Sequence, residues 1–366
     1  MAGSGFGTNF RITTWGETHG AGVGVVVDGC PAGLPLERED VQKYLDRRKP
    51  GQSKYTTQRK EGDQVEILSG IFEGRTTGTP ISMVVYNKDQ RSKDYSNIKD
   101  IYRPGHADFT FDMKYGFRDY RGGGRSSGRE TIGRVAAGAV AAKVLKELGI
   151  EIKAYAKAIA GIEISKDHFD FAEMNNNPFN MPDKEAAKLV QEKADQMIKE
   201  MDSIGGIIEC QITGMPVGIG ETVFDKLDAE LSKAIMSIGS VKGFEIGDGF
   251  EAANLRGSEN NDDFICVDGK VEKETNHSGG VLGGMSDGSA IVFRAAIKPT
   301  PSIAQTQKTV NRDLDNVEIE IHGRHDPMIV PRAVVVVESM AAVTILDGVL
   351  KNLGATMDNI KKIYGE

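Results

Sequence analysis

From Gly122 to Leu148 the chain reads GGGRSSGRETIGRVAAGAVAAKVLKEL. The stretch from Thr131 to Leu148 has apolar or small residues at helical spacing and is followed by Gly149, which predicts a helix that ends there. Its glycines and alanines permit close packing on several sides, so we expect this helix to be buried. Ser127 and Glu130 have the spacing of a capping box, which places the helix N-terminus directly after the loop.

The loop before this helix has the composition of an anion-binding site. Its leading glycines let the backbone adopt positive φ and approach a ligand closely. Arg125 and Arg129 bring planar guanidinium groups that suit phosphate or carboxylate. Taken alone, Ser127 is better explained as a helix cap, but a capping loop is also where an anion binds. The loop therefore predicts a small, highly anionic ligand.

Composition limits the classes of protein to consider. The chain has 366 residues, 39% of them hydrophobic, which is enough to bury a large core. A formal net charge of -8 argues against general nucleic-acid binding. Cys30, Cys210 and Cys266 lie far apart, which favours free thiols in a reducing cytosol over a disulfide framework or a zinc site. We see no signal pattern and no apolar run that approaches membrane-spanning length, so we expect a cytoplasmic protein with no membrane contact.

The predicted elements favour an α+β fold in a single large domain, residues 1–366, because strands and helices mix without strict alternation. Strands are expected at Val23–Val27, Val65–Leu68, Ile207–Ile212, Ile291–Ala295, Val317–Ile321 and Ala333–Val337. Further helices are expected at Glu37–Arg48, Asp183–Met201, Lys226–Met236 and Ser339–Leu353. Long segments without either period are expected to be ordered, ligand-facing loops: Lys49–Lys60, Asn87–Phe117, Asn254–Gly284 and Pro299–Arg312.

Three side chains could carry acid–base chemistry. His19 lies in Gly16-Glu-Thr-His-Gly20, where a glycine-flanked imidazole can be approached closely and titrates near neutrality. His106 lies in the turn Arg103-Pro-Gly-His-Ala-Asp108, and Asp108 could orient its ring. Asp326 precedes a proline and could act as a base if buried beside a ligand. Purely structural turns would also explain all three.

Basic residues are concentrated in glycine- and proline-containing loops of this acidic chain, which suggests a local positive pocket. The basic residues are Arg47, Arg48, Lys49, Lys54, Arg103, Arg118, Arg121, Arg125, Arg129, Arg134, Lys298 and Arg324. The first four could instead be dipole partners at a helix C-terminus.

Common nucleotide and metal motifs are missing. There is no GxxxxGK[ST] loop and no GxGxxG between a strand and a helix, so a nucleotide-dependent transferase is disfavoured. The HxxH spacing of His322 and His325 is a poor zinc signal, because no further ligand lies nearby in sequence. We therefore expect no metal site.

The chain resembles the chorismate synthase family over essentially its whole length. The resemblance rests on stretches whose joint order is specific to that family. They are Gly16–Gly29, Asp46–Gly51, Asp89–Tyr95, Arg103–Asp108, Gly122–Gly138, Lys298–Ser302 and Arg324–Ser339. Thr18, Gly128 and Lys54 depart from the family pattern, which has serine, alanine and arginine there, but none of these changes puts the activity in serious doubt.

The resemblance implies a fold and a reaction. The fold is a β-α-β sandwich, with long ligand-facing loops here. The reaction is a lyase step of the shikimate pathway, in aromatic amino acid biosynthesis. It is a 1,4-elimination of phosphate from 5-enolpyruvylshikimate 3-phosphate to chorismate, and it requires reduced FMN. The family is usually homotetrameric, and the modest length favours a separate flavin reductase over reduction of the flavin by NADPH on the same chain.

The resemblance also assigns roles to residues. His19, His106, Asp326, Ser127 and Thr18 correspond to catalytic or supporting groups. The substrate-binding set is Arg48, Lys54, Arg129 and Arg324. The FMN-binding set is Arg125, Ser126, Ser127, Gly239, Ser240, Gly283, Lys298, Pro299, Thr300, Pro301, Ser302 and Arg324. The alternative to an enzyme is a non-catalytic protein that binds FMN or a phosphometabolite.

Overall fold

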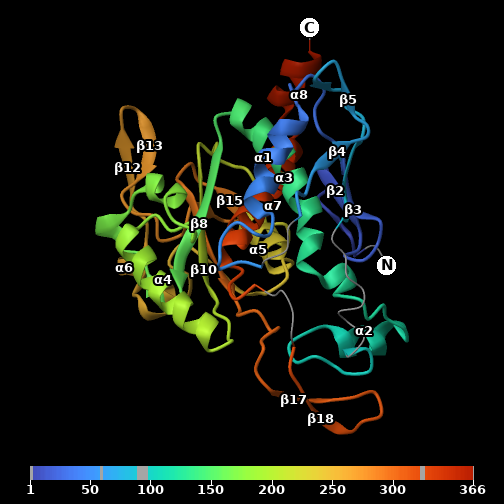
Figure 1. The fold of residues 1–366 in the computed structure, drawn as a ribbon. Helices are drawn as coiled ribbons and strands as arrows, with labels where there is room; N and C mark the ends of the chain where they lie inside the picture. Colours follow the sequence, from blue (N-terminus) through green and yellow to red (C-terminus); the bar gives the residue numbers. More distant parts are fainter. Residues whose placement is uncertain (1–2, 58–60, 89–97, 322–325, 366) are drawn as a thin grey trace.

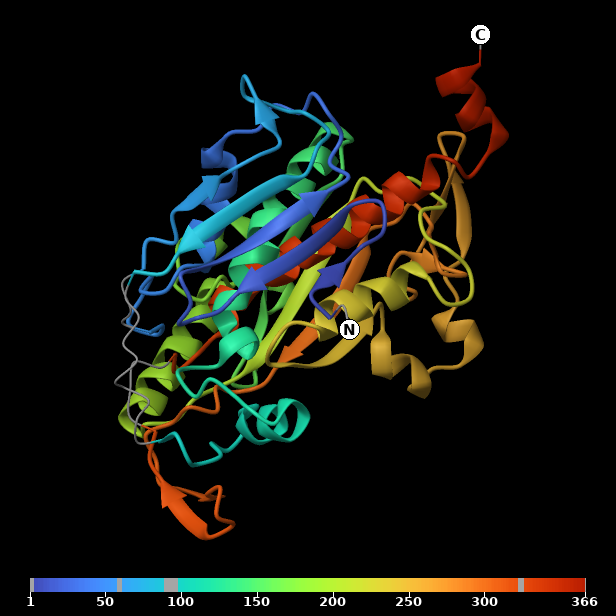
Figure 2. The same ribbon diagram turned by 90° about the vertical axis from the view of Figure 1, so that its right-hand side faces the viewer.

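Helices α3 (Thr131–Glu147) and α7 (Val330–Asn352) run side by side through the middle of the fold, between two antiparallel sheets (Figures 1 and 2). The computed structural model describes residues 3–57, 61–88, 98–321 and 326–365. Helix α3 packs on the first sheet, and α7 packs on the second. This arrangement confirms the predicted α+β sandwich.

Each sheet has five strands. The first, in spatial order, contains β1 (Gly5–Phe6), β2 (Arg11–Gly16), β3 (Gly22–Asp28), β7 (Ile81–Tyr86) and β4 (Val65–Ile67). The second contains β11 (Val241–Ile246), β16 (Ile291–Ile297), β10 (Gly206–Thr213), β8 (Glu151–Ile159) and β9 (Ile162–Glu163). The strands predicted at Val23–Val27, Ile207–Ile212 and Ile291–Ala295 lie within β3, β10 and β16 and are confirmed. The strand predicted at Val65–Leu68 is confirmed as β4 except for Leu68, which lies beyond its end.

The remaining elements lie around this sandwich. The helices are α1 (Arg38–Arg48), α2 (Asp108–Tyr115), α4 (Lys184–Lys199), α5 (Leu227–Met236), α6 (Gly257–Asn260) and α8 (Met357–Tyr364). Short 3-10 turns are η2 (Gly124–Ser126), η3 (Gly128–Glu130), η4 (Lys166–His168), η5 (Phe171–Asn175) and η6 (Gly249–Asn254). Four small hairpins pair β5 (Ile71–Phe72) with β6 (Arg75–Thr76), β12 (Phe264–Val267) with β13 (Lys270–Lys273), β14 (Val281–Leu282) with β15 (Met285–Ser286), and β17 (Gln307–Val310) with β18 (Asn316–Ile319).

The predicted strand at Ala333–Val337 is wrong. These residues belong to α7, which begins before them, has Pro331 in its first turn and continues through the predicted helix. The run of valines has a high strand propensity, but its side chains are buried within the helical layer, and tertiary packing overrides propensity.

The predicted strand Ala333–Val337 and the predicted helix Ser339–Leu353 are parts of one helix. The expectation that no apolar run approaches membrane-spanning length is therefore corrected. Among the described residues, α7 is the one helix long and apolar enough to cross a membrane, with 23 residues. However, 78% of its most apolar window is buried inside the fold, so its role as a core helix accounts for this composition.

Three segments were expected to lack regular structure but contain short elements, and one of them, Pro299–Arg312, contains strand β17. Helix α2 lies within the Asn87–Phe117 segment, and its sequence DFTFDMKY has no apolar stripe that could have revealed it. The β12–β13 hairpin lies within Asn254–Gly284. Its turn, Asp268-Gly269, has positive φ at both residues and is a hairpin signal that the sequence did carry.

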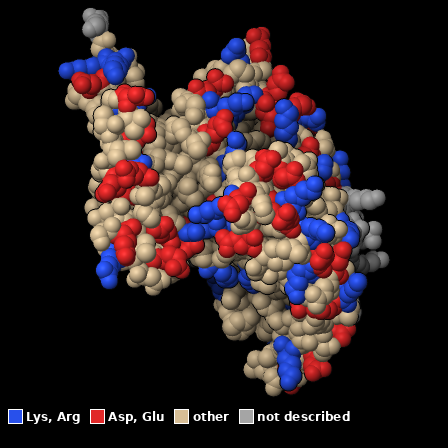
Figure 3. Space-filling view, turned by 90° about the vertical axis from the view of Figure 1, so that its left-hand side faces the viewer, with Lys and Arg blue, Asp and Glu red and all other residues tan. Residues whose placement is uncertain are grey.

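Charged side chains are mixed over the surface. On the face drawn in Figure 3, Lys and Arg are interspersed with Asp and Glu, and no extended basic area is visible. Cys30 and Cys210 are buried, Cys266 is exposed, and all three are free thiols.

The two central helices are in close contact at Gly138. A Cβ added there would lie 2.2 Å from Ser339 Cβ and 2.5 Å from Ser339 Cα. Since real side chains do not tolerate such distances, α3 and α7 can pack at this spacing only with glycine at position 138.

We therefore expect Gly138→Ala to lower the free energy of unfolding by about 1–3 kcal/mol, because overpacking forces the two helices apart. Urea denaturation would measure this change. Gly354→Ala is the control, since a Cβ there meets nothing within 4 Å. Equal stabilities of the two variants would contradict this account of the helix contact.

Candidate functional site

A cleft of about 1410 Å³ opens beside the N-terminal end of α3. Loops far apart in the sequence line it: residues 103–108, 122–131, 237–240, 300–302 and 326–333 all contribute. The cleft therefore brings the predicted anion-binding loop together with other loops that the sequence singled out.

The loop before α3 forms two short 3-10 turns, η2 and η3. Ser127 Oγ accepts a hydrogen bond from the Arg129 N–H at 3.3 Å, which confirms the predicted cap. The second half of the predicted capping box is wrong. The Glu130 carboxylate instead accepts from Thr14 Oγ1 at 3.0 Å and pairs with Arg134 at 2.8 Å, so it ties the loop to strand β2 and to the next helical turn.

Arg129 lines the cleft, and polar side chains of other segments bind its guanidinium group. Its Nη1 lies 3.1 Å from Asp63 Oδ1 and 3.2 Å from Glu61 Oε2, and its Nε donates to Asn87 Oδ1 at 3.0 Å. Its Nη2 is buried without a hydrogen-bond partner among the described residues. Because an unpaired buried donor is costly, this atom is suited to an anionic ligand.

Arg48, at the end of α1, has its donors occupied. It donates to Asp63 Oδ2 at 2.7 Å, to Thr131 Oγ1 at 3.0 Å and to the Gly128 carbonyl at 2.9 Å. Burial lowers the pKa of Arg48 to about 10 although Asp63 opposes the shift, and the side chain stays cationic at neutral pH. It contributes positive charge beneath the loop.

Two predicted cations, Arg125 and Lys54, have partners within the protein. The Arg125 guanidinium donates to Thr14 Oγ1 at 2.7 Å and to the Thr14 and Gly16 carbonyls, each at 3.1 Å. It fastens the loop to β2 while still lining the cleft. Lys54 pairs with Asp195 of α4 at 2.8 Å, is more than half exposed, and is not among the cleft residues.

His106 has a defined protonation pattern. Its Nδ1 lies 2.9 Å from the Pro104 carbonyl, which can only accept, so Nδ1 carries the proton. Its Nε2 lies 2.9 Å from Ser302 Oγ and accepts from that hydroxyl in the neutral ring. Burial, and then the positive charge of Arg103, lower the pKa of His106 below its ordinary value.

The expectation that Asp108 orients this imidazole is wrong. The Asp108 carboxylate accepts from Arg103 Nε at 2.7 Å and Nη2 at 2.8 Å, and it pairs with Arg118 at 2.9 Å. Asp108 therefore holds the turn through the two arginines, and backbone and Ser302 contacts hold the ring.

The low pKa of His106 makes folding depend on pH. The unfolded chain binds a proton near pH 6.5, and the folded chain resists doing so. The stabilisation is therefore complete above the unfolded pKa and is lost as pH falls towards the folded pKa. We expect wild-type protein to lose more unfolding free energy on acidification through this window than His106→Gln does. Urea denaturation on both sides of the window measures this difference, and parallel pH profiles would contradict it.

Thr18 and His19 lie in the turn between β2 and β3, against the anion-binding loop. A Cβ added at Gly122 would lie 2.9 Å from His19 Cδ2, and φ is +85° at this glycine, so the loop approaches the imidazole only because position 122 is glycine. Thr18 lines the cleft, and its Oγ1 is buried with no hydrogen-bond partner among the described residues.

Asp326 lines the cleft, and two contacts hold its carboxylate. Its Oδ1 accepts from the Thr57 N–H at 2.8 Å, and its Oδ2 pairs with Arg332 at 2.7 Å. Arg332 Nε also donates to the Arg48 carbonyl at 3.0 Å, so the carboxylate is joined to the end of α1.

Most of the predicted FMN-binding residues line the cleft. The segment with Gly239 and Ser240 contacts the segment that begins at Lys298, because the Lys298 N–H donates to the Ser240 carbonyl at 2.9 Å. The cleft residues from the predicted set are Arg125, Ser126, Ser127, Gly239, Ser240, Lys298, Thr300, Pro301 and Ser302. Pro299 and Gly283 are not among them, and Gly283 lies in the turn between β14 and β15. Arg324, His322 and His325 lie outside the described residues.

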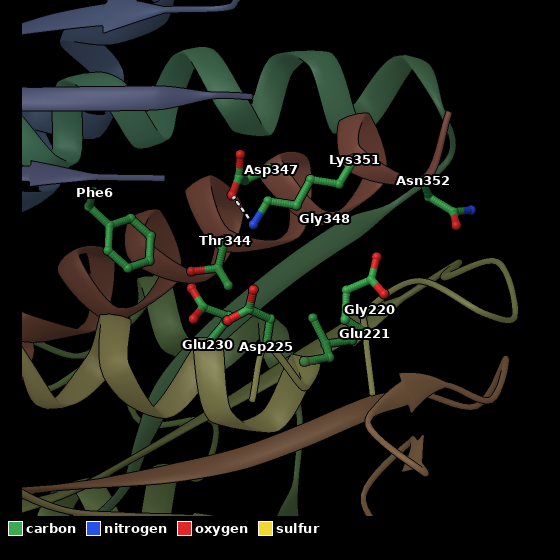
Figure 4. Close-up of a pocket in the computed structure, with 11 residues that line it drawn as sticks. Phe6, Gly220, Glu221, Asp225, Glu230, Thr344, Asp347, Gly348, Lys351 and Asn352 are labelled. Carbon is green, nitrogen blue, oxygen red and sulfur yellow. Dashed lines mark ion pairs between the residues drawn. The ribbon is translucent and has the colours of Figure 1, made fainter. Parts of the chain in front are cut away.

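A second pocket, of about 20 Å³, lies between α5 and α7 (Figure 4). It is lined by Glu221, Asp225, Glu230 and Asp347, and the Asp347 carboxylate pairs with Lys351 at 2.9 Å. Its size and acidic lining do not suit a phosphorylated ligand. In the part of the chain that the structure describes, no group of three or more His, Cys, Asp or Glu is placed to hold a metal ion.

Sequence reasoning missed several supports of the site. Asp63 is buried between Arg48 and Arg129, and Arg332 pairs with Asp326. Asp63 follows a glycine in a polar loop, and Arg332 directly precedes the run Ala333–Val337 that was interpreted as a strand, so nothing local distinguished them. Only the fold shows which carboxylates and cations meet.

Comparisons with known proteins all give one family. The family model described as chorismate synthase matches residues 10–350. Chorismate synthase of Lachnospira eligens is 68% identical over 364 residues and covers 100% of both chains. That of Methanococcoides burtonii is 56% identical over 96% of this chain and 97% of its own. A solved structure titled "Crystal Structure of Chorismate Synthase" has a TM-score of 0.76 and 31% identity, covering 98% of this chain and 96% of its own. The chain thus belongs to the chorismate synthase family.

Proposed function

We propose that this chain converts 5-enolpyruvylshikimate 3-phosphate to chorismate with reduced FMN bound in the large cleft. The observation that carries the proposal is that the cleft gathers Arg129, His106, Thr18 and Asp326 in one space, with His19 packed against its loop. Its volume of about 1410 Å³ exceeds the roughly 300–1,000 Å³ of an ordinary ligand pocket, which supports room for a substrate and a cofactor together.

The binding groups suit a substrate with one phosphate and two carboxylates. Arg129 offers an Nη2 that is buried without a partner among the described residues, and Arg48 adds positive charge beneath the same loop. Ser126 and Ser127 add hydroxyl groups along the cleft. Lys54 and Arg324 remain predicted substrate contacts.

The residues present also fit FMN. Thr300 lines the cleft, and its Oγ1 is buried without a partner among the described residues. Lys298, Ser302, Gly239 and Ser240 line the same cleft. When bound, reduced FMN would supply an electron-rich ring for breaking a C–H bond that no neighbouring carbonyl activates. Gly283 and Pro299 remain predicted contacts of the cofactor.

Side chains of the protein would remove and donate the protons in this reaction. In the elimination, the ring C–H bond and the C–O bond to phosphate break, and a new C=C bond forms. We propose that Asp326 helps to take the ring proton and that His19 donates a proton to the departing phosphate. His106, neutral and held by Pro104 and Ser302, would hold or release a proton beside the cofactor.

The decisive experiment is an anaerobic assay of phosphate release with chemically reduced FMN. Turnover would support the proposal, whereas ligand binding without phosphate release would favour the non-catalytic alternative. Oxidised FMN with NADPH should give no turnover if a separate reductase is needed. A nucleoside triphosphate should have no effect.

We also propose that the protein assembles as a homotetramer, as the family usually does. Light scattering coupled to size-exclusion chromatography tests this assembly directly. Cytoplasmic location remains a prediction from the sequence.

Replacing Arg129 with lysine should raise the substrate KM by about 10- to 100-fold, because one charge-assisted hydrogen bond is worth about 1.5–3 kcal/mol. Lysine keeps the charge but cannot contact Asp63, Asn87 and a ligand at the same time. Steady-state kinetics measures the change. Arg75→Lys is the control, since Arg75 is exposed and donates to the Gly33 carbonyl at 2.9 Å. An unchanged KM for Arg129→Lys would remove Arg129 from the binding set.

A further inference from the structure

Asn87 directly follows strand β7, beside the turn that carries Thr18 and His19. Gly22, the first residue of β3, pairs with Tyr86, the last residue of β7. One residue further on, the Asn87 N–H donates to the Ala21 carbonyl at 3.0 Å. The sheet therefore delivers the Asn87 side chain to the base of the β2–β3 turn.

The Asn87 amide uses both of its ends. Its Nδ2 donates to the Glu17 carbonyl at 2.9 Å and to the Gly20 carbonyl at 2.8 Å. Its Oδ1 accepts from Arg129 Nε at 3.0 Å. These partners fix the orientation of the amide, because carbonyls can only accept and the guanidinium can only donate.

We infer that Asn87 is a positioning residue, which sets the turn carrying Thr18 and His19 at a fixed distance from Arg129. The two carbonyls that it binds flank those residues on both sides. Arg129 and Thr18 both line the cleft, and among the described residues Arg129 Nη2 and Thr18 Oγ1 are buried without a hydrogen-bond partner. This role rests on the proposed function, in which the turn and Arg129 act on the same phosphorylated substrate.

Two substitutions separate the ends of the amide. Asn87→Ala removes both, and Asn87→Asp keeps an oxygen for Arg129 but replaces the donor with an oxygen that faces two carbonyls. If Asn87 positions the turn, both variants should lose roughly 100-fold in kcat, the cost of misplacing a reacting group by about 1 Å. Wild-type kcat in Asn87→Asp would overturn the inference.

Asn177 provides a matched control. Its Nδ2 also donates to two backbone carbonyls, those of Glu173 at 2.6 Å and Met181 at 2.8 Å, but it does not line the cleft. Asn177→Ala should lower the melting temperature as Asn87→Ala does, and it should leave kcat unchanged. A similar loss of kcat in both variants would show that general stability, and not positioning, explains the effect.

A readout without turnover separates this inference from the proposed function. The NMR titration of the His19 ring in free protein should change in chemical shift and midpoint in Asn87→Ala but not in Asn177→Ala. If wild-type protein releases no phosphate, the proposed function fails and this titration still decides the inference. An unchanged His19 titration in Asn87→Ala would overturn it.

Discussion

Replacing His106 with alanine is expected to lower kcat by about 100- to 10,000-fold, the usual contribution of one acid–base group. The imidazole lines the cleft, is held at both ring nitrogens, and is kept neutral by burial and by Arg103. The stability cost should be small, since the ring forms one bond to a local carbonyl and one to Ser302. Steady-state phosphate release under anaerobic conditions and thermal denaturation measure the two effects.

The control for this prediction is His168→Ala. His168 is half exposed, lies 3.4 Å from Glu185, and is not among the cleft residues. It should leave kcat unchanged. If His106→Ala lost activity only in proportion to its loss of stability, His106 would be a structural turn residue, as the sequence alone allowed.

Local sequence signals were sufficient for helix α3 and for strands β3, β4, β10 and β16, but no strand was predicted at β2, β7, β8 or β11. The spacing of small residues in Thr131–Leu148 predicted a buried α3, and Gly138 shows why small residues are needed, because α7 passes at a distance that excludes a Cβ. The same reasoning failed for Ala333–Val337. By propensity a run of valines is typical of a strand, and only the fold shows that this run belongs to a helix packed between α3 and the second sheet.

Only part of the candidate site could be predicted from the sequence. The motifs around His19, His106 and Ser127 could be recognised because glycine, proline and capping residues leave local patterns. The partners of those motifs could not, since the Asp63 contacts with Arg48 and Arg129 depend on where a polar loop crosses two other elements. For the same reason, Asp108 was assigned to His106 by proximity in sequence, although the fold gives it to Arg103 and Arg118.

The second large effect is expected for Asp326→Asn. Removing a base from the reaction should lower kcat by about 100- to 10,000-fold, with the substrate KM changed only a few-fold. Asparagine can still accept the Thr57 N–H with its oxygen, so the backbone contact survives. The ion pair with Arg332 is lost, which should also cost stability because both side chains are largely buried. Steady-state kinetics measures the loss of kcat, and urea denaturation of the same variant measures the loss of stability.

Asp347→Asn is the control that distinguishes the loss of catalysis from the loss of stability. Asp347 has a similar environment: Oδ1 accepts the N–H groups of Thr8, Asn9 and Phe10, and Oδ2 pairs with Lys351 at 2.9 Å. It lines the small pocket and not the cleft, so its asparagine variant should lose stability while keeping kcat. If Asp326→Asn likewise kept kcat, the ring proton would have to leave by another route, and Asp326 would serve only to join Thr57 and Arg332.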